Sequence, residues 1–98
     1  MRRRQIVYAP DARQDRVNIT RWLTLRASAE VARRFDHRIR NAVHSLEYAS
    51  ERGTVRDDHL GLRIIGILPT VSIAFSVTED AVIVHRILYL GQSWASGD

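Results

Sequence analysis

The last third of the chain contains three short apolar runs, and these constrain the fold more than any other feature. The runs extend from Leu62 to Leu68, from Val71 to Val77 and from Ala81 to Leu90. Only Pro69-Thr70 and Thr78-Glu79-Asp80 separate them, and links this short join neighbouring antiparallel strands. The sequence therefore predicts a three-stranded antiparallel β-meander.

The middle run has one apolar face and one face of small residues, because strand side chains alternate. The two sets are Val71, Ile73, Phe75 and Val77, and Ser72, Ala74 and Ser76. We expect the apolar set to pack against helices and the small set to leave room for another polypeptide. The last run is apolar on both faces, with Val82, Val84 and Leu88 alternating with Ile83, Ile87 and Tyr89. It is therefore expected to be a buried, central strand.

Two polar residues, His85 and Arg86, interrupt the last run. Strict alternation predicts that they point to opposite faces and do not form one catalytic pair. An arginine in an apolar strand needs a carboxylate partner or an open groove, because an unpaired charge there is costly. We expect a structural ion pair for Arg86 and a hydrogen-bonded imidazole for His85, with acid-base chemistry as the alternative.

The first part of the chain predicts a short strand over residues 3–8 and then a helix. Pro10 suits the first turn of a helix, and Asp11 beside it complements the helix dipole. The expected buried stripe is Ala12, Ile19, Trp22 and Leu23. Arg16 lies near the seam of this stripe, so we expect it to extend its charge to solvent, to pair with an acid or to face a partner.

A second, longer helix is expected to begin after Ser28, a favourable N-cap residue. Its apolar positions recur at spacings of three and four: Ala32, Phe35, Ile39, Ala42, Val43, Leu46 and Ala49. The short link between the two helices predicts an antiparallel hairpin. Gly53 is placed to end the second helix, and Thr54 to Leu60 is expected to be a polar loop.

The predicted order is strand, helix, helix, strand, strand, strand, an α+β fold with the helical hairpin on one face of the sheet. A chain of 98 residues has room for one domain, which we expect to span residues 1–98. The chain contains no cysteine and no apolar run near the roughly 20 residues that cross a bilayer. We therefore expect a cytoplasmic protein without membrane contact.

All 15 basic residues counted as lysine or arginine are arginine, and the net charge is +4. A guanidinium binds carboxylates and phosphates as a planar fork, so charge alone fits an acidic protein or a nucleic acid. The second helix carries Arg33, Arg34, Arg38 and Arg40, which are either a phosphate-binding stripe or a solvated face. His37 and His44 lack a third metal-ligand residue at suitable spacing, so no metal site is expected.

The ordered pattern over nearly the whole chain resembles the ParE branch of the bacterial RelE/ParE toxins. The matching residues are Val7-Tyr8, Pro10, Ala12, Asp15, Ile19, Trp22-Leu23, Ala32, Phe35, Ile39, Leu46, Gly53, Gly61-Leu62-Arg63, Ile83-Val84 and Arg86-Ile87-Leu88-Tyr89. The resemblance implies the toxin of a type II toxin-antitoxin pair, bound in a hetero-oligomer by a ParD-like antitoxin and using no cofactor. ParE toxins are associated with DNA gyrase, and RelE toxins with cutting messenger RNA in the ribosomal A site. No sequence-specific DNA binding is expected.

The choice between these two branches depends on catalytic groups. RNA cleavage requires activation of the 2′-hydroxyl, cations that stabilise the phosphorane and a proton for the leaving oxygen. RelE-type nucleases carry the basic residues for this on the meander strands, where this chain has Ile64, Gly66 and Ser72. No catalytic residue is therefore assigned; a nuclease would have to use Arg63, Arg86 and Tyr89.

Seven residues are candidates for contact with the antitoxin or the target: Arg16, Thr20, Arg63, Ser72, Ala74, Ser76 and Trp94. Arg16 and Thr20 replace the leucine and aromatic residue usual in the family. Arg63 either binds a partner or forms a salt bridge with the neighbouring Asp57-Asp58. Trp94 either closes the edge of the core or is an exposed anchor.

Three functions follow from the sequence. The first is a non-enzymatic gyrase inhibitor of the ParE kind. The alternative is a ribosome-dependent endoribonuclease of the RelE kind. The third is a family member that binds antitoxin but is no longer toxic, for which Gln92-Ser93, in place of a charged pair frequent in the family, is an argument.

Overall fold

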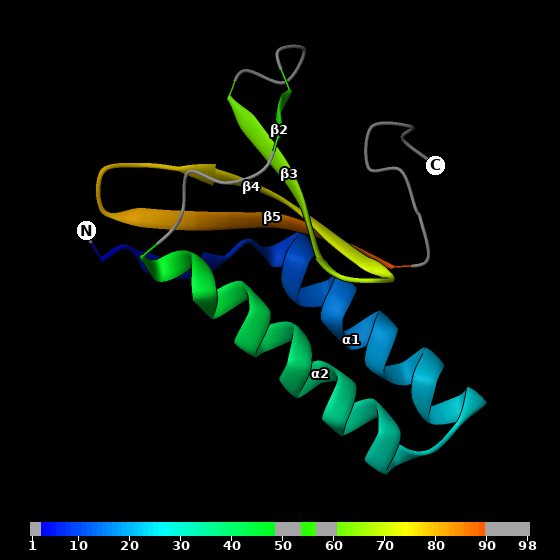
Figure 1. Ribbon diagram of the computed structural model, residues 1–98. Coiled ribbons are helices and arrows are strands. Elements are labelled where there is room, and N and C mark those ends of the chain that lie inside the picture. The colour runs from blue at the N-terminus through cyan, green and yellow to red at the C-terminus, as the bar shows by residue number, and fades with distance from the viewer. Residues whose placement is uncertain (1–2, 49–53, 57–60, 90–98) are drawn as a thin grey trace.

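The computed structural model describes residues 3–48, 54–56 and 61–89 and contains a helical hairpin beside a five-stranded sheet (Figure 1). The elements are β1 (Gln5–Tyr8), α1 (Pro10–Arg26), α2 (Ala29–His44), the 3-10 helix η1 (Ser45–Glu47), β2 (Thr54–Arg56), β3 (Leu62–Leu68), β4 (Val71–Val77) and β5 (Ala81–Tyr89). The predicted α+β fold, with its helical hairpin and meander, is confirmed.

Local signals in the sequence determine the ends of the helices. Pro10 is in the first turn of α1. The Ser28 hydroxyl accepts a hydrogen bond from the backbone N–H of Val31 at 3.1 Å, as predicted for an N-cap. Only Ala27 and Ser28 separate the two helices, so they return antiparallel along one another (Figure 1).

The strand order of the sheet is β1-β5-β4-β3-β2. β5 therefore has a neighbour on each side, as its apolar composition predicted. It pairs antiparallel with β4 and parallel with β1, from Gln5 opposite Ala81 to Tyr8 opposite Val84. The first and last of the described strands thus lie side by side.

The segment from Thr54 to Leu60 was expected to be a polar loop, and this is wrong for its first three residues. Thr54–Arg56 forms β2 and pairs antiparallel with β3, with Val55 opposite Arg63. β2 forms through backbone hydrogen bonds to the open edge of β3, which do not depend on the side-chain pattern. Three residues are also too few to show the alternation that predicts a strand. Gly53, Ala49 and residues 57–60 lie outside the described residues.

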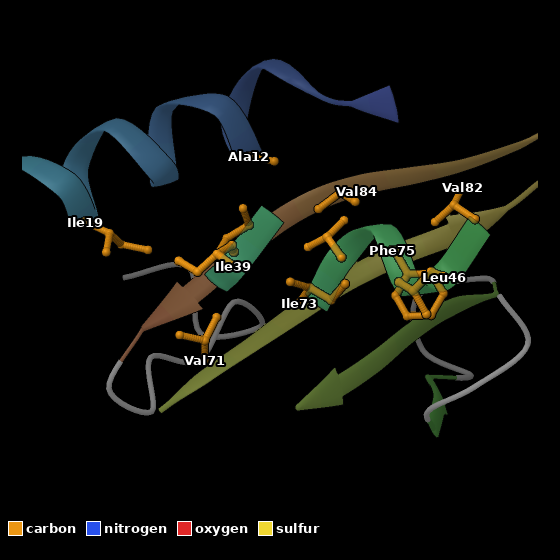
Figure 2. Packing of buried hydrophobic residues seen from close by; sticks show 11 residues of the cluster. Ala12, Ile19, Ile39, Leu46, Val71, Ile73, Phe75, Val82 and Val84 are labelled. Atoms are coloured by element: carbon orange, nitrogen blue, oxygen red, sulfur yellow. The ribbon is translucent and has the colours of Figure 1, made fainter. Parts of the chain in front are cut away.

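One hydrophobic core fills the space between the hairpin and the sheet. It consists of Ala12, Ile19, Ile39, Val43, Leu46, Val71, Ile73, Phe75, Val82, Val84 and Ile87. Figure 2 shows Ala12 and Ile19 pointing from α1 toward the strands. Of the predicted stripes, Ala12, Ile19, Ala32, Ile39, Val43 and Leu46 are buried, and Leu23, Phe35 and Ala42 are partly buried. Trp22 is 37% exposed because it lies at the margin between α1 and the end of β5.

A β-bulge interrupts β5 and changes which of its residues face the core. Phe75 is opposite Val84 but Ala74 is opposite Arg86, so His85 is an extra residue in β5. As a result Ile87 joins Val82 and Val84 in the core, whereas strict alternation had placed it on the other face. Strict alternation, from which His85 and Arg86 were expected to point to opposite faces, does not hold at this bulge. The two side chains nevertheless have separate partners, Ser76 on β4 for His85 and Asp15 on α1 for Arg86.

Phe75 lies at the centre of the core and is completely buried. Replacing it with alanine (Phe75→Ala) should lower the free energy of unfolding by about 3 to 5 kcal/mol, because it removes apolar burial and leaves a cavity. Denaturant unfolding followed by circular dichroism measures the change. The exposed Val17 offers a control, since Val17→Ala should cost less than about 0.5 kcal/mol. Equal losses in the two variants would contradict this core assignment.

Candidate functional site

A carboxylate on α1 holds the arginine that interrupts β5. Arg86 donates from Nε to Asp15 Oδ2 at 2.8 Å and from Nη2 to Oδ1 at 3.0 Å. Asp15 Oδ2 also accepts a hydrogen bond from the backbone N–H of Ile87 at 2.8 Å. β1 pairs with β5 only as far as Val84, so Asp15 provides an acceptor beyond the end of that pairing. We call this group the Asp15–Arg86 clamp.

The clamp confirms the structural ion pair expected for Arg86. The Asp15 side chain is 12% exposed and that of Arg86 36%. The hydrogen bond that Arg86 donates to Asp15 raises the pKa of the Arg86 guanidinium, against a smaller opposing effect of burial. Arg86 therefore remains a cation, with the fork of its guanidinium occupied by a carboxylate of the same chain.

Tyr89 lies in an aromatic cluster between the two helices and the end of β5. Its ring makes edge-to-face contacts with Trp22 at 5.5 Å and with Phe35 at 5.4 Å between centroids. Arg26 lies over the other side of this cluster, 5.2 Å from the centroid of Trp22. Such aromatic pairs stabilise packing beyond the area they bury, so the position of Tyr89 has a structural explanation.

The three residues that a nuclease would need do not converge. Arg63 is opposite Phe75 on β4, so it lies on the helix-facing side of β3. β4 separates β3 from β5, which places the backbones of Arg63 and Arg86 roughly 10 Å apart or more at ordinary strand spacing. Asp57 and Asp58, the proposed partners of Arg63, lie outside the described residues.

The small-residue face of β4 is only partly accessible. Ser76 Oγ lies 2.8 Å from His85 Nε2, and both side chains are partly buried. Ser72 is also partly exposed, but Ala74 is completely buried. A partner could therefore reach Ser72 and Ser76 but not Ala74 in this conformation. The hydrogen bond to Ser76 agrees with the structural role expected for His85.

A shallow groove on α1 brings Arg16 and Thr20 together. It has a volume of about 510 Å³ and is lined by Arg13, Arg16, Val17, Thr20, Arg21 and Asp36. Arg16 donates to both carboxylate oxygens of Asp36 on α2, at 2.9 and 2.8 Å, which confirms that it pairs with an acid. Its guanidinium also lies 5.2 Å from the ring centroid of Tyr8. We call this hollow the α1 groove.

The pairs of the α1 groove change the acidity of two groups. The hydrogen bond to Asp36 raises the pKa of Arg16. Burial raises the pKa of the Tyr8 hydroxyl, although the neighbouring Arg16 lowers it to a smaller extent. Both groups therefore keep their ordinary charge near neutral pH, and the groove offers fixed charges rather than an acid or a base.

Sequence reasoning did not assign roles to Asp15 and Asp36. Asp15 was part of the family pattern, but Arg86 is 71 positions away, and no local spacing connects them. Asp36 is only 20 positions from Arg16, and an antiparallel hairpin does bring those two turns together. The predicted antiparallel pairing of the two helices could therefore have identified Asp36 as the partner of Arg16.

The remaining candidates are the histidines of α2 and Trp94. Across residues 3–48, 54–56 and 61–89 no three potential metal ligands gather, and His44 Nδ1 lies 3.2 Å from Glu47 Oε1. Trp94 lies outside the described residues. No described helix is both long enough and apolar enough to span a bilayer.

Comparison with solved structures defines the class of fold. A chain of the chromosomal ParDE toxin-antitoxin system from P. aeruginosa superposes with a TM-score of 0.77 at 18% identity, covering 89% of this chain and 96% of that one. A chain of the E. coli DinJ-YafQ toxin-antitoxin complex gives a TM-score of 0.56 at 12% identity, covering 89% and 92%. At such low identity these matches show a shared RelE/ParE-like fold.

The sequence itself identifies the family. The profile of the family described as "ParE toxin of type II toxin-antitoxin system, parDE" matches residues 6–94. The chain therefore belongs to the ParE family of type II toxins. No curated protein matches the sequence.

The clamp predicts an energetic coupling between Asp15 and Arg86. A double-mutant cycle of Asp15→Asn and Arg86→Gln should give a coupling energy of about 1 to 3 kcal/mol. Either single substitution already breaks the charged hydrogen bonds, so the double variant should lose less stability than the sum of the two single variants. Urea unfolding of the two single variants and the double variant measures it.

The exposed pair Gln14 and Asn18, joined at 2.9 Å along α1, is the matched control. Gln14→Ala and Asn18→Ala should couple by less than about 0.5 kcal/mol. Strictly additive effects at Asp15 and Arg86 would show that the clamp does not hold α1 to β5.

Proposed function

We propose that this ParE-family protein inhibits DNA gyrase by binding it, without cutting nucleic acid, and is neutralised by a ParD-like antitoxin. The observation that carries the proposal is the Asp15–Arg86 clamp. Arg86 is the cation best placed within the meander to stabilise a phosphorane, and its fork is already bound to Asp15. A phosphate would have to displace a bidentate carboxylate and a backbone contact.

The other groups that RNA cleavage would need give further support. Positions occupied by basic residues in RelE-type nucleases are Ile64, Gly66 and Ser72 here. Tyr89 packs its ring between Trp22 and Phe35. Efficient general acid-base catalysis requires groups within hydrogen-bond reach of one reacting phosphate. Arg63, on β3, is separated from Arg86 and Tyr89 on β5 by β4 and does not complete such a set.

The α1 groove supports the proposed antitoxin contact. Val17 provides an apolar surface that is 48% exposed, and Arg13 and Arg21 lie exposed on the rim. An acidic amphipathic segment would match this combination, with its apolar residues on Val17 and its carboxylates on the arginines. Arg16, held by Asp36, would shape the floor of the groove. Both proposed partners place the protein in the cytoplasm.

The gyrase proposal predicts a direct effect on the purified enzyme. Adding the protein to gyrase, relaxed plasmid and ATP should stop supercoiling, and adding the antitoxin first should restore it. In cells, induction should block DNA synthesis and start the SOS response before any transcript is cut.

A different result would support the nuclease alternative. Cleavage of ribosome-bound messenger RNA by the purified protein, abolished by Arg86→Gln or by Tyr89→Phe, would overturn the proposal. A protein that binds antitoxin but neither slows growth nor affects gyrase would instead be a non-toxic family member.

The α1 groove predicts a charge-sensitive antitoxin affinity. Val17→Glu should weaken antitoxin binding at least about tenfold, or about 1.4 kcal/mol, because it places a carboxylate where an acidic segment would bind. Val31→Glu is the matched control: Val31 is an exposed helical valine on α2, 37% accessible, outside this groove. Isothermal titration calorimetry measures both. Equal affinities in the two variants would place the antitoxin elsewhere.

A further inference from the structure

The side of α2 that points away from the sheet forms a second, separate basic surface. Arg33, Arg34, His37 and Arg38 occupy two successive turns and are all exposed. The residues that α2 buries are Ala32, Ile39 and Val43. At 3.6 residues per turn the two sets lie on opposite sides of the helix. We call the exposed set the outer α2 face.

The arginines of this face bind no carboxylate among the described residues. The four side chains line a shallow hollow of about 460 Å³. In the part of the chain that the structure describes, Arg33, Arg34 and Arg38 have no ion pair and no side-chain hydrogen bond. Arg16 and Arg86, by contrast, each bind a carboxylate through two nitrogens. Asp36, also on α2, is directed to Arg16 and does not neutralise the outer face.

The residue types on this face favour one class of ligand. Three guanidinium forks match phosphate oxygens, which accept hydrogen bonds in the same planar geometry. Val31 and Phe35 line a smaller hollow beside them with Arg34 and Arg38, so the face is a cluster of cations with an apolar margin. His37 and the neighbouring exposed Asn41 are able to stack on or hydrogen-bond a base, so comparing two unrelated duplexes tests for sequence preference.

We propose that the outer α2 face binds the phosphate backbone of duplex DNA without sequence preference. Phosphate contacts of this kind position a protein on DNA but carry no base specificity. α2 lies along the outside of the molecule next to α1 (Figure 1), and Val17 and Thr20 of the α1 groove belong to the other helix. Such a contact would hold the protein beside DNA, and it does not depend on the proposed inhibition of gyrase.

The salt dependence of DNA binding tests the proposal. Fluorescence anisotropy with labelled duplexes of about 20 base pairs and two unrelated sequences gives the slope of log K against log salt. Each phosphate contact on B-DNA contributes about 0.9 to that slope. The triple variant Arg33→Gln, Arg34→Gln, Arg38→Gln should therefore lower the slope by about 2 to 3 for both sequences.

The matched control removes the same charge from the other helix. Arg13→Gln, Arg21→Gln, Arg26→Gln also lowers the net charge by three but should leave the slope within about 1 of the parent protein. Circular dichroism and thermal unfolding confirm that both variants are folded. The control variant should bind antitoxin less well, while the α2 variant should bind it normally.

Three results would overturn the proposal. Equal loss of slope in both variants would mean that net charge alone attracts DNA. An unchanged slope in the α2 variant would mean that this face makes no phosphate contacts. Loss of antitoxin binding in the α2 variant, with DNA binding intact, would identify the face as a surface for an acidic protein. A protein that binds DNA as expected but leaves gyrase active would overturn only the proposed function.

Discussion

The two layers of this protein are joined at their edge by one carboxylate. Asp15 binds the guanidinium of Arg86 and the backbone N–H of Ile87, at the point where β5 has lost its pairing with β1. The carboxylate therefore neutralises the Arg86 charge and accepts a hydrogen bond from an unpaired backbone N–H of β5. Both contacts fix α1 against the bulged end of β5. Breaking such a pair would leave a partly buried charge without its partner, which is more costly than never having formed it.

The function proposed for the protein follows from how its arginines are used. Arg86 and Arg16 are bound to carboxylates of the same chain and act as structural links. Arg33, Arg34 and Arg38 point to solvent from α2. The arginines thus fall into two groups, those paired with carboxylates and those facing solvent, which the sequence alone does not distinguish. The carboxylates bound to Arg16 and Arg86 argue against phosphate chemistry at the sheet. The solvent-facing arginines of α2 support the separate proposal of DNA binding.

The sequence was a good guide wherever a signal is local. Pro10, Ser28 and the turn at Pro69-Thr70 marked the ends of elements, and the spacing of Ala32, Ile39 and Val43 marked the buried side of α2. These features depend on neighbours within a few residues, where backbone preference and periodicity act.

Features that depend on distant partners could not be predicted. β2 forms because β3 offers it an edge, and the extra residue at His85 becomes visible only against the register of β4. The bond from Asp15 to Arg86 spans 71 positions. For the candidate site, residue types indicated which arginines needed partners, but only the three-dimensional arrangement showed that Asp15 and Asp36 supply them.

The parallel pairing of β1 with β5 also sets the order in which the molecule can assemble. Gln5 is opposite Ala81, so β1 must wait for almost the whole chain before its partner exists, and closing so long a loop carries an entropic cost. The helical hairpin has only local contacts to make and can form much earlier. On the ribosome, β1 would remain unpaired until β5 leaves the exit tunnel, so this edge of the sheet closes after the helical hairpin.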